Sequence, residues 1–348
     1  PYDGGVFHQA PLLLAFFNFL PSILVPLLFV FVDYLSALQL VEIAKHKAEL
    51  MAAERWPEPP ADYTLVPSDI GTLYLLNPYS IITCLAQSTL VFSTLSVVMG
   101  IRYAIEGNRN LSMLCIAVAA HLSFYPLMMV APCVMLLVQA LKVDALKVSW
   151  TSLSLFGGYL AGLLGLSYLL VGSWRFLQST YGVILFVPDL TPNIGLFWYF
   201  FIEMFDQFRP FFLCVFQVLV FIFVIPIVTR FRQHPLFVAC VLTTIAAIFK
   251  SYPSVGDTAL YLALLSVHHE LFTYMRNTFL VFNALVYASI LGPLFFNLWL
   301  YAGSGNANFF YAITLVFGLA QIILIVDVIY AMIRREWERY CVTLGDSA

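Results

Sequence analysis

The chain has 348 residues, a mass of 39.2 kDa and a formal net charge of −3. Hydrophobic residues make up 62% of it and charged residues only 10%, whereas a typical soluble domain has about 25% charged residues. This composition excludes a soluble enzyme and a disordered chain, because too few charged side chains are present to cover a water-exposed surface. The charge balance leaves no basic footprint for nucleic acid, so we expect no nucleic-acid partner.

Long apolar segments dominate the sequence. A membrane-spanning helix needs about 20 apolar residues, so the chain has room for roughly eight to eleven spanning or partly spanning helices. We therefore predict an all-α, polytopic helical membrane protein with a single integral membrane domain over residues 1–348. The predicted apolar segments, in chain order, are 11–44, 71–100, 111–140, 150–172, 211–229, 236–249, 258–267, 278–300 and 308–333.

Prolines and polar residues punctuate these segments. Pairs of prolines interrupt the first and third, Asn77-Pro78 breaks the second, and residues 45–70 form the clearest polar loop. The segment 150–172 is a cleaner span, whose glycines allow close contact with another helix. These glycines are Gly157, Gly158, Gly162 and Gly165.

The region 188–260 contains short apolar runs separated by prolines. Backbone that is released from helix hydrogen bonding in a membrane is buried in protein or lines a cavity. The region therefore forms either a cavity wall or a kinked bundle without a cavity, and composition does not separate the two.

Basic residues are spread too evenly along the first half of the chain to set its orientation in the membrane. Three arginines after the last span favour a cytosolic C-terminus; they are Arg334, Arg335 and Arg339.

The first candidate site is the segment 187–208, with the sequence VPDLTPNIGLFWYFFIEMFDQF. Thr191 is predicted to cap a helix that opens with Pro192, which has no amide hydrogen to lose there. Glu203 and Asp206 are three residues apart, so on a helix they share a face. Two carboxylates beside aromatic rings suit acid–base chemistry, a cation or sugar hydroxyls. A helix end in the interfacial aromatic belt is the commoner explanation.

Two further segments carry polar groups between apolar runs. In YAGSGNANFFYAITL, residues 301–315, Asn306 or Asn308 can cap the following helix, and amides at a helix start can also bind phosphate. In FKSYPSVGDTALYLAL, residues 249–264, Lys250 either pairs with Asp257 or faces a lipid phosphate. Ionisable residues inside spans, such as Asp33 and Asp327, are functional hypotheses by default, although no partner is evident from the sequence.

The six cysteines form no CxxC pair, and five of them lie in apolar stretches, so neither a disulfide framework nor a metal site is predicted. The sequence contains no Walker loop, GxSxG or HExxH motif. We therefore predict no catalytic residue, no metal and no cofactor.

The motifs described above resemble a known family. PYDGGVFHQAPLL, YLLNPYSIITCLAQST and the segments 187–208, 249–264 and 301–315 occur in this order in the PIG-U family. Its members are multi-span subunits of the glycosylphosphatidylinositol (GPI) transamidase of the endoplasmic reticulum. The likeness runs from residue 1 to about residue 340. It implies a GT-C-like membrane bundle and a role in joining GPI anchors to the C-termini of proproteins.

The resemblance also implies a division of labour. Transamidase chemistry belongs to a caspase-like cysteine protease subunit, PIG-K, with PIG-T, PIG-S and a GPAA-type subunit as further partners. A member of the PIG-U family is a non-catalytic subunit that binds or presents the GPI lipid. This agrees with Cys341 being the one cysteine outside a predicted span.

Residue roles follow from the same resemblance. Asn306 and Asn308 are the candidates for binding the GPI head group. The lipid-contact candidates are Asp189, Asn193, Phe197, Trp198, Glu203, Lys250 and Asp257. Two departures are evident: the loop 45–70 differs in composition, and the family's preceding apolar segment and lumenal loop are absent, so we expect an N-terminal piece to be missing.

Two alternatives come from other functional classes. VFHQAPLL and LLNPYSI resemble stretches of GT-C transferases, which favours a dolichol-phosphate-mannose-dependent mannosyltransferase of GPI biosynthesis. Such enzymes use an acidic base in the first lumenal loop, of which only Asp3 is present. A transporter or flippase would show inverted internal repeats, and the sequence shows none.

Overall fold

The computed structural model describes residues 2, 7–53 and 65–345, and these residues form helices joined by short turns, with no strand among them. The helices are α1 (Pro11–Phe19), η1 (Ser22–Leu24), α2 (Val25–Ala53), α3 (Pro67–Leu76), α4 (Pro78–Leu85), α5 (Leu90–Ile105), α6 (Arg109–Leu122), η2 (Tyr125–Met129), α7 (Val130–Leu141), α8 (Ala145–Val171), α9 (Arg175–Leu177), η3 (Gln178–Gly182), α10 (Val183–Phe186), α11 (Phe197–Glu203), η4 (Asp206–Phe208), α12 (Arg209–Ile222), α13 (Val224–Arg230), α14 (Pro235–Phe249), α15 (Val255–Ser266), η5 (His269–Tyr274), α16 (Thr278–Leu300) and α17 (Ala307–Gly345).

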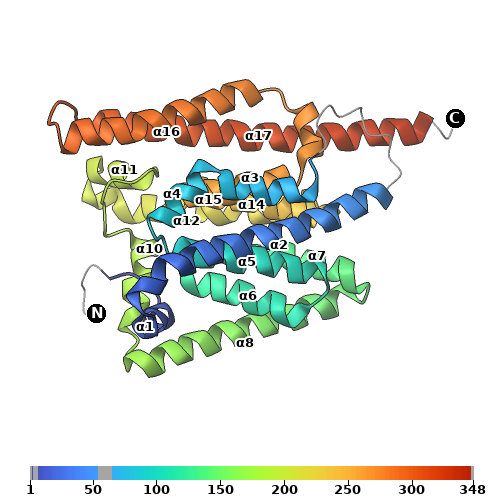
Figure 1. Cartoon of the computed structure of the whole chain (residues 1–348), viewed down its shortest axis with the longest axis horizontal. Helices are drawn as coiled ribbons and strands as arrows, with labels where there is room; N and C mark the ends of the chain where they lie inside the picture. The colour runs from blue at the N-terminus through green and yellow to red at the C-terminus, as the bar shows by residue number, and fades with distance from the viewer. Residues whose placement is uncertain (1, 3–6, 54–64, 346–348) are drawn as a thin grey trace.

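The architecture is a bundle of antiparallel helices that lie along the longest axis of the molecule (Figure 1). Within the described residues, five helices are long and apolar enough to cross a membrane, and five more are shorter and apolar. The five long ones are Ser22–Ala52, Ala145–Val171, Asp206–Arg230, Thr278–Leu300 and Ala307–Val342. The prediction of an all-α, multi-pass membrane protein is therefore confirmed.

Local chemistry explains where the apolar segments break. Asn77 ends α3 and caps α4, where its Oδ1 accepts a hydrogen bond from the Tyr79 amide at 3.0 Å and Pro78 occupies the first turn. The segment 111–140 divides into α6 and α7. The polar loop proved shorter than the predicted 45–70. α2 continues to Ala53, because Lys, Glu, Leu and Ala favour helix, and residues 54–64 lie outside the described part.

α14 and α15 lie at the centre of the bundle, where almost all of their side chains are buried. The two helices contact each other, and α14 also packs on α7 and α17. A helix that is apolar on every face satisfies its side chains only in a protein or lipid interior. α14 and α15 are thus core helices with cavities at their ends, whereas α12 and α13 belong to the largely exposed span Asp206–Arg230.

The glycines of α8 do not make the predicted close helix contact. A Cβ atom built at Gly157, Gly158, Gly162 or Gly165 would meet no atom within 4 Å. Only 11% of the span window in this helix is buried. α8 lies at the edge of the bundle (Figure 1), so these glycines face outward, and the expectation is wrong within the chain.

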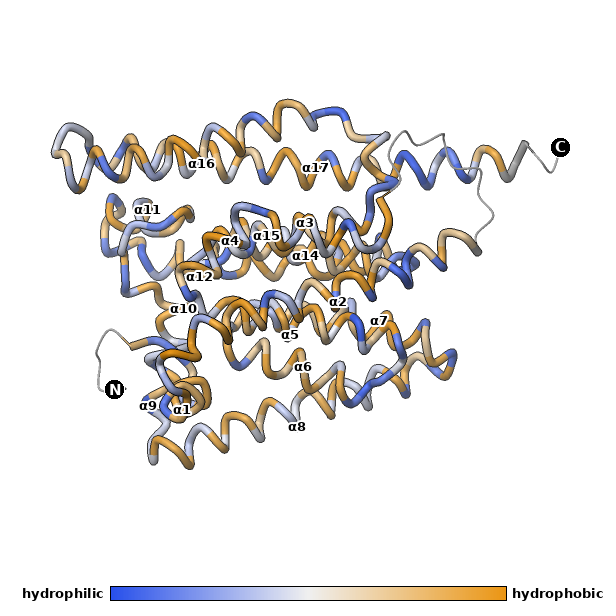
Figure 2. The backbone as a smooth tube through the Cα atoms, in the orientation of Figure 1, coloured by the Kyte–Doolittle hydropathy of each residue, from blue (hydrophilic) through white to orange (hydrophobic). Residues whose placement is uncertain are grey.

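The bundle has two chemically different ends. We call one the basic end: α2, α5, α7, α13 and α17 all finish there, and Figure 2 shows hydrophilic residues gathered where α2 and α17 end. Lys47, Lys142, Arg230, Arg232 and Arg339 meet at this end, where they line one cavity. At the opposite end, α17 begins and the chain passes through the loop between α10 and α11 (Figure 1).

Candidate functional site

The three polar segments singled out in the sequence meet at the end opposite the basic end. The Tyr252 hydroxyl donates a hydrogen bond to the Asp189 carbonyl at 2.9 Å, and the Tyr311 hydroxyl donates to the Leu196 carbonyl at 3.2 Å. The loop 187–196 therefore connects the 250–257 segment to the start of α17. We call the surface formed by 187–203, 250–257 and 301–311 the motif platform.

The loop 187–196 takes its shape from its own side chains. Asp189 accepts hydrogen bonds from the Thr191 amide at 2.9 Å and the Thr191 hydroxyl at 2.5 Å. These bonds lower the pKa of the Asp189 carboxyl below its usual value, so it remains ionised. Local side-chain bonds of this kind compete with helix formation. The predicted helix starting at Pro192 is absent for this reason, and α11 begins at Phe197.

Asn193 completes the loop and packs it against the next segment. Its Oδ1 accepts a hydrogen bond from the Gly195 amide at 2.8 Å, and its Nδ2 donates to the Thr191 carbonyl at 3.2 Å. A Cβ at Gly195 would lie 2.6 Å from the ring of Pro253. Glycine is required at this close approach, so the side chains of Asp189 and Asn193 position the loop.

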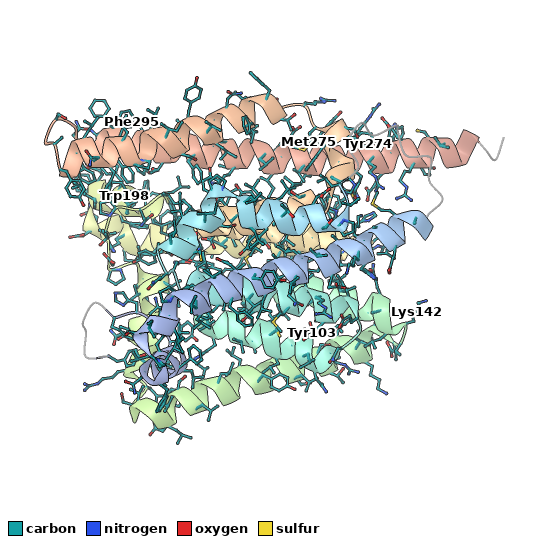
Figure 3. All side chains as sticks on the ribbon, in the orientation of Figure 1. Tyr103, Lys142, Trp198, Tyr274, Met275 and Phe295 are labelled. Atoms are coloured by element: carbon teal, nitrogen blue, oxygen red, sulfur yellow. The ribbon has the colours of Figure 1, made fainter. Side chains whose placement is uncertain are left out.

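α11 is anchored by two buried aromatic residues. Phe197 and Trp198 are each 1% exposed. The Phe197 ring lies 4.9 Å from that of Phe216, and Trp198 stacks on Trp299 with ring centroids 6.1 Å apart. Figure 3 shows Trp198 beneath the α16–α17 pair. Neither ring reaches the surface, so both pack α11 onto its neighbours.

Glu203, the last residue of α11, and Asp206 do not share a helix face. α11 ends at Glu203, the following Met204 has extended backbone, and Asp206 starts η4. Both side chains are exposed. The interpretation of Glu203 and Asp206 as a pair on one helix is therefore wrong, because the chain turns between them.

Asn306 and Asn308 begin the longest helix in the described chain. Asn306 caps α17, since its Oδ1 accepts a hydrogen bond from the Phe309 amide at 3.3 Å. The Oδ1 of Asn308 accepts a hydrogen bond from the Tyr199 hydroxyl on α11. Both side chains are exposed. Their Nδ2 groups donate to no described residue, so four N–H donors beside the positive end of a helix remain available to a ligand.

Lys250 and Asp257 form a buried ion pair. Lys250 Nζ lies 2.6 Å from Asp257 Oδ2, and Asp257 also accepts a hydrogen bond from the Ser254 amide at 2.8 Å as part of a capping box. The sequence left open whether Lys250 pairs with Asp257 or faces a lipid phosphate, and the structure shows the pair with Asp257. Lys250 also lines two cavities of about 230 and 50 Å³. The larger is open to His8, Ser123 and Tyr252.

Sequence reasoning missed the tyrosines that join these segments. Tyr199, Tyr252 and Tyr311 each place a hydroxyl on a neighbouring segment. The available signal was their position inside the three motifs, since a half-buried tyrosine commonly uses its hydroxyl for a hydrogen bond. The isolated carboxylates also have partners: Asp33 accepts a hydrogen bond from Tyr74 at 3.0 Å, and Asp327 accepts from backbone amides that precede α16.

No group of three or more potential metal ligands occurs among the residues whose structure is described. Asp3, the residue considered as a mannosyltransferase base, lies outside those residues.

Comparison with known proteins identifies the family. A family model described as GPI transamidase subunit PIG-U matches residues 1–317. The chain is 40% identical to the human GPI-anchor transamidase component PIGU over 359 aligned residues, covering 97% of this chain and 82% of the human one. It is 34% identical to the GPI transamidase component GAB1 of Saccharomyces cerevisiae, covering 97% and 82% of the two chains.

These relatives are named as transamidase components, and they give no support to the mannosyltransferase alternative. The matched residues include all three segments of the motif platform and end at residue 317. The described part of the chain also has several helices able to span a membrane. The chain belongs to the PIG-U family and is a multi-pass membrane component of the GPI transamidase.

Proposed function

We propose that this chain is a non-catalytic subunit that binds the GPI lipid at the motif platform and presents it to the catalytic subunit. The observation that carries the proposal is the contact between Tyr199 and Asn308. It joins two separate segments into one surface, where Asn306 and Asn308 offer unused amide donors. GPI has phosphate and sugar hydroxyl groups, and both accept hydrogen bonds from such donors.

The surroundings of the two asparagines suit a lipid with a large polar head. Large apolar side chains are exposed beside them; Tyr301 is 77% exposed and Phe309 55% exposed. Phe205, just before η4, and Phe208, at its end, are exposed as well. Aromatic rings at the ends of spanning helices lie at the membrane interface. Such a surface holds the head group above the membrane while the tails remain in the bilayer.

The chemistry of anchor attachment is assigned to a partner. The cysteine nucleophile of a transamidase needs a histidine base and an oxyanion hole in a water-accessible site. In the described residues Cys341 lies on α17 and Cys214 on α12, and both are exposed on helix surfaces without a histidine hydrogen bond. We assign catalysis to the caspase-like subunit PIG-K, with PIG-T, PIG-S and a GPAA-type subunit completing the complex in the endoplasmic reticulum membrane.

The proposal is tested by Asn306→Asp and Asn308→Asp. Aspartate has nearly the same shape, caps a helix as well as asparagine, and can still accept the Tyr199 hydrogen bond. It replaces the amide donors with a negative charge that repels phosphate. Both variants are expected to assemble with the other subunits. They should attach GPI anchors at least roughly tenfold more slowly, because one or two charge-assisted contacts are lost.

Asn306→Ser separates the two effects, because serine preserves the helix cap and keeps one hydroxyl donor without adding charge, so its loss should be smaller than that of Asn306→Asp. GPI attachment is measured by surface display of a GPI-anchored reporter, and assembly by co-purification of the other subunits. Normal display with both aspartate variants would refute the head-group assignment. Loss of assembly in both would mean that the asparagines have only a structural role.

A further inference from the structure

The basic end contains a large cavity that has no part in the proposed GPI site. Its volume is about 960 Å³, within the range of small-molecule sites. It lies where α2, α5, α7, α13 and α17 finish and α14 begins. Figure 3 shows Lys142, one of its lining residues, at the opposite end of the molecule from Trp198.

Positive charge dominates the wall of this cavity. It is lined by Lys47, Lys142, Arg230, Arg232 and Arg339, against two carboxylates, Glu106 and Glu336. Both carboxylates are already in ion pairs: Glu106 with Arg102 at 2.8 Å and Glu336 with Arg230 at 2.8 Å. An excess of unneutralised cationic charge therefore faces the cavity.

Lys142 and Arg232 carry that excess. Both are exposed, and neither forms an ion pair within the part of the chain described by the structure. Lys47 differs from them, because its Nζ lies 2.9 Å from the buried Glu270 carboxylate. Lys142 and Arg232 are thus free to contact a ligand, whereas Lys47 is held by the protein.

The part of the wall that carries these two residues is fixed in place. Lys142 ends α7 with a left-handed backbone, φ +51°, and its amide donates to the Val138 carbonyl. The last turn of α7 is bonded to the segment between α13 and α14, because Gln139 Nε2 donates a hydrogen bond to the Gln233 carbonyl at 3.2 Å. The residue that follows Arg232 is therefore bonded to the helix that ends at Lys142.

The deeper wall is apolar. It is formed by the buried Leu136, Leu236 and Met332, from three different helices, and the exposed Leu50 lines the cavity nearer its mouth. A polar mouth above an apolar wall at the ends of spanning helices lies at the depth of lipid head groups. Basic pockets between spanning helices bind phosphorylated lipid head groups, and clusters of Lys and Arg mark the cytoplasmic side.

We propose that the basic-end cavity binds the phosphorylated head group of an anionic lipid from the cytosolic leaflet, with Lys142 and Arg232 contacting the phosphate. This site is separate from the motif platform, which lies at the other end of the bundle. Two lipids would then hold the chain from opposite leaflets, with GPI on one side and an anionic phospholipid on the other.

The test uses the assembled transamidase complex in nanodiscs of phosphatidylcholine, with or without phosphatidylinositol phosphate. Retained lipid is measured by native mass spectrometry. The double variant Lys142→Gln/Arg232→Gln is expected to lower retention roughly tenfold or more, because each basic group near the membrane surface is worth about a fivefold change in binding. Neither residue forms an ion pair with a described residue, so the fold is expected to be preserved.

The matched control is Lys147→Gln/Arg334→Gln. It removes the same charge from the same end, but neither residue lines the cavity. Retention should be unchanged in this control. An equal fall in both double variants would overturn the proposal and indicate general surface attraction.

A second arm distinguishes the source of the phosphate. Soluble inositol phosphate is added to the complex in detergent, and lipid retention is measured again. Weak displacement supports a lipid head group held partly by the apolar wall. Full displacement at equal concentration would overturn the lipid assignment in favour of a soluble phosphate compound. Asn308→Asp should leave the retention of the anionic lipid unchanged. The proposal for the basic-end cavity can therefore fail without affecting the proposed GPI site, and the reverse.

Discussion

Lys250 and Asp257 face each other across the turn between α14 and α15, with Nζ 2.6 Å from Oδ2 and side chains only 8% and 14% exposed. Asp257 simultaneously caps α15 through the Ser254 amide. The pair thus fixes the turn that carries Tyr252 and Pro253, the two residues on which the loop 187–196 rests. A charge pair in the core of the bundle therefore determines the position of the motif platform.

Removing one partner of this pair is expected to destabilise the protein. Lys250→Met leaves the Asp257 carboxylate buried without a counter-ion, at a cost of roughly 3–5 kcal/mol in the free energy of unfolding. Lys250→Met/Asp257→Asn should recover most of that loss. Thermal unfolding of the purified protein in detergent measures both. A double variant that is stable but cannot attach GPI would show that Lys250 contacts lipid as well.

Gly195→Ala is expected to displace the loop 187–196 from Pro253. The added methyl group would lie 2.6 Å from the proline ring, and overpacking of this kind costs about 1–3 kcal/mol. GPI attachment should fall together with the melting temperature. Gly158→Ala on α8 is the matched control, because its methyl group meets nothing within 4 Å, and it should leave both measurements unchanged. A lower melting temperature in the control alone would contradict this account.

The ion pair between Lys47 and Glu270 predicts a dependence of stability on pH. Burial raises the pKa of Glu270, but His268 and the Lys47 ammonium outweigh it and hold the pKa well below its ordinary value. The stabilisation is therefore present above the ordinary pKa of glutamate and is lost as the pH falls toward the pKa in the folded protein. Melting temperatures measured across the acidic range should fall less steeply in Glu270→Gln than in the unmodified chain. Parallel curves would rule out this contribution.

Asp327→Ala should loosen the start of α16. The carboxylate is 3% exposed and accepts hydrogen bonds from the Arg276 amide at 2.9 Å and the Asn277 amide at 2.8 Å. Leaving these amides unpaired costs about 1–3 kcal/mol. Hydrogen exchange should become faster at residues 276–280, whereas Asp327→Asn, which keeps one acceptor oxygen, should show a smaller effect. Unchanged exchange in Asp327→Ala would show that other groups satisfy these amides.

Cys341→Ser is expected to have no effect on GPI attachment. The thiol lies on the exposed surface of α17, and the proposed division of labour places the nucleophile in a partner subunit. The assay is surface display of a GPI-anchored reporter, with Cys214→Ser as a second exposed cysteine for comparison. Complete loss of display in Cys341→Ser alone would overturn the non-catalytic assignment.

The orientation of the chain illustrates a limit of the sequence. Counted along the first half of the chain, basic residues are evenly distributed, because the order of the loops in the sequence does not show which of them lie together in space. Once the helices are arranged in space, Lys47, Lys142, Arg230, Arg232 and Arg339 come together at the basic end from α2, α7, α13 and α17. The asymmetry is a property of the bundle, and it favours the same cytosolic C-terminus that Arg334, Arg335 and Arg339 indicated.

The sequence by itself determined the membrane class, the helical architecture, the breaks at Asn77 and near Pro126, and the family, because apolar run length and proline positions act locally. It could not determine whether Thr191 caps a helix, whether Glu203 and Asp206 share a face, or that Phe197 and Trp198 are buried. Those outcomes depend on contacts between residues far apart in the chain, such as Tyr252 with Asp189 and Tyr199 with Asn308. Only the tertiary structure brings such groups within hydrogen-bonding distance, and it therefore decided the geometry of both candidate sites.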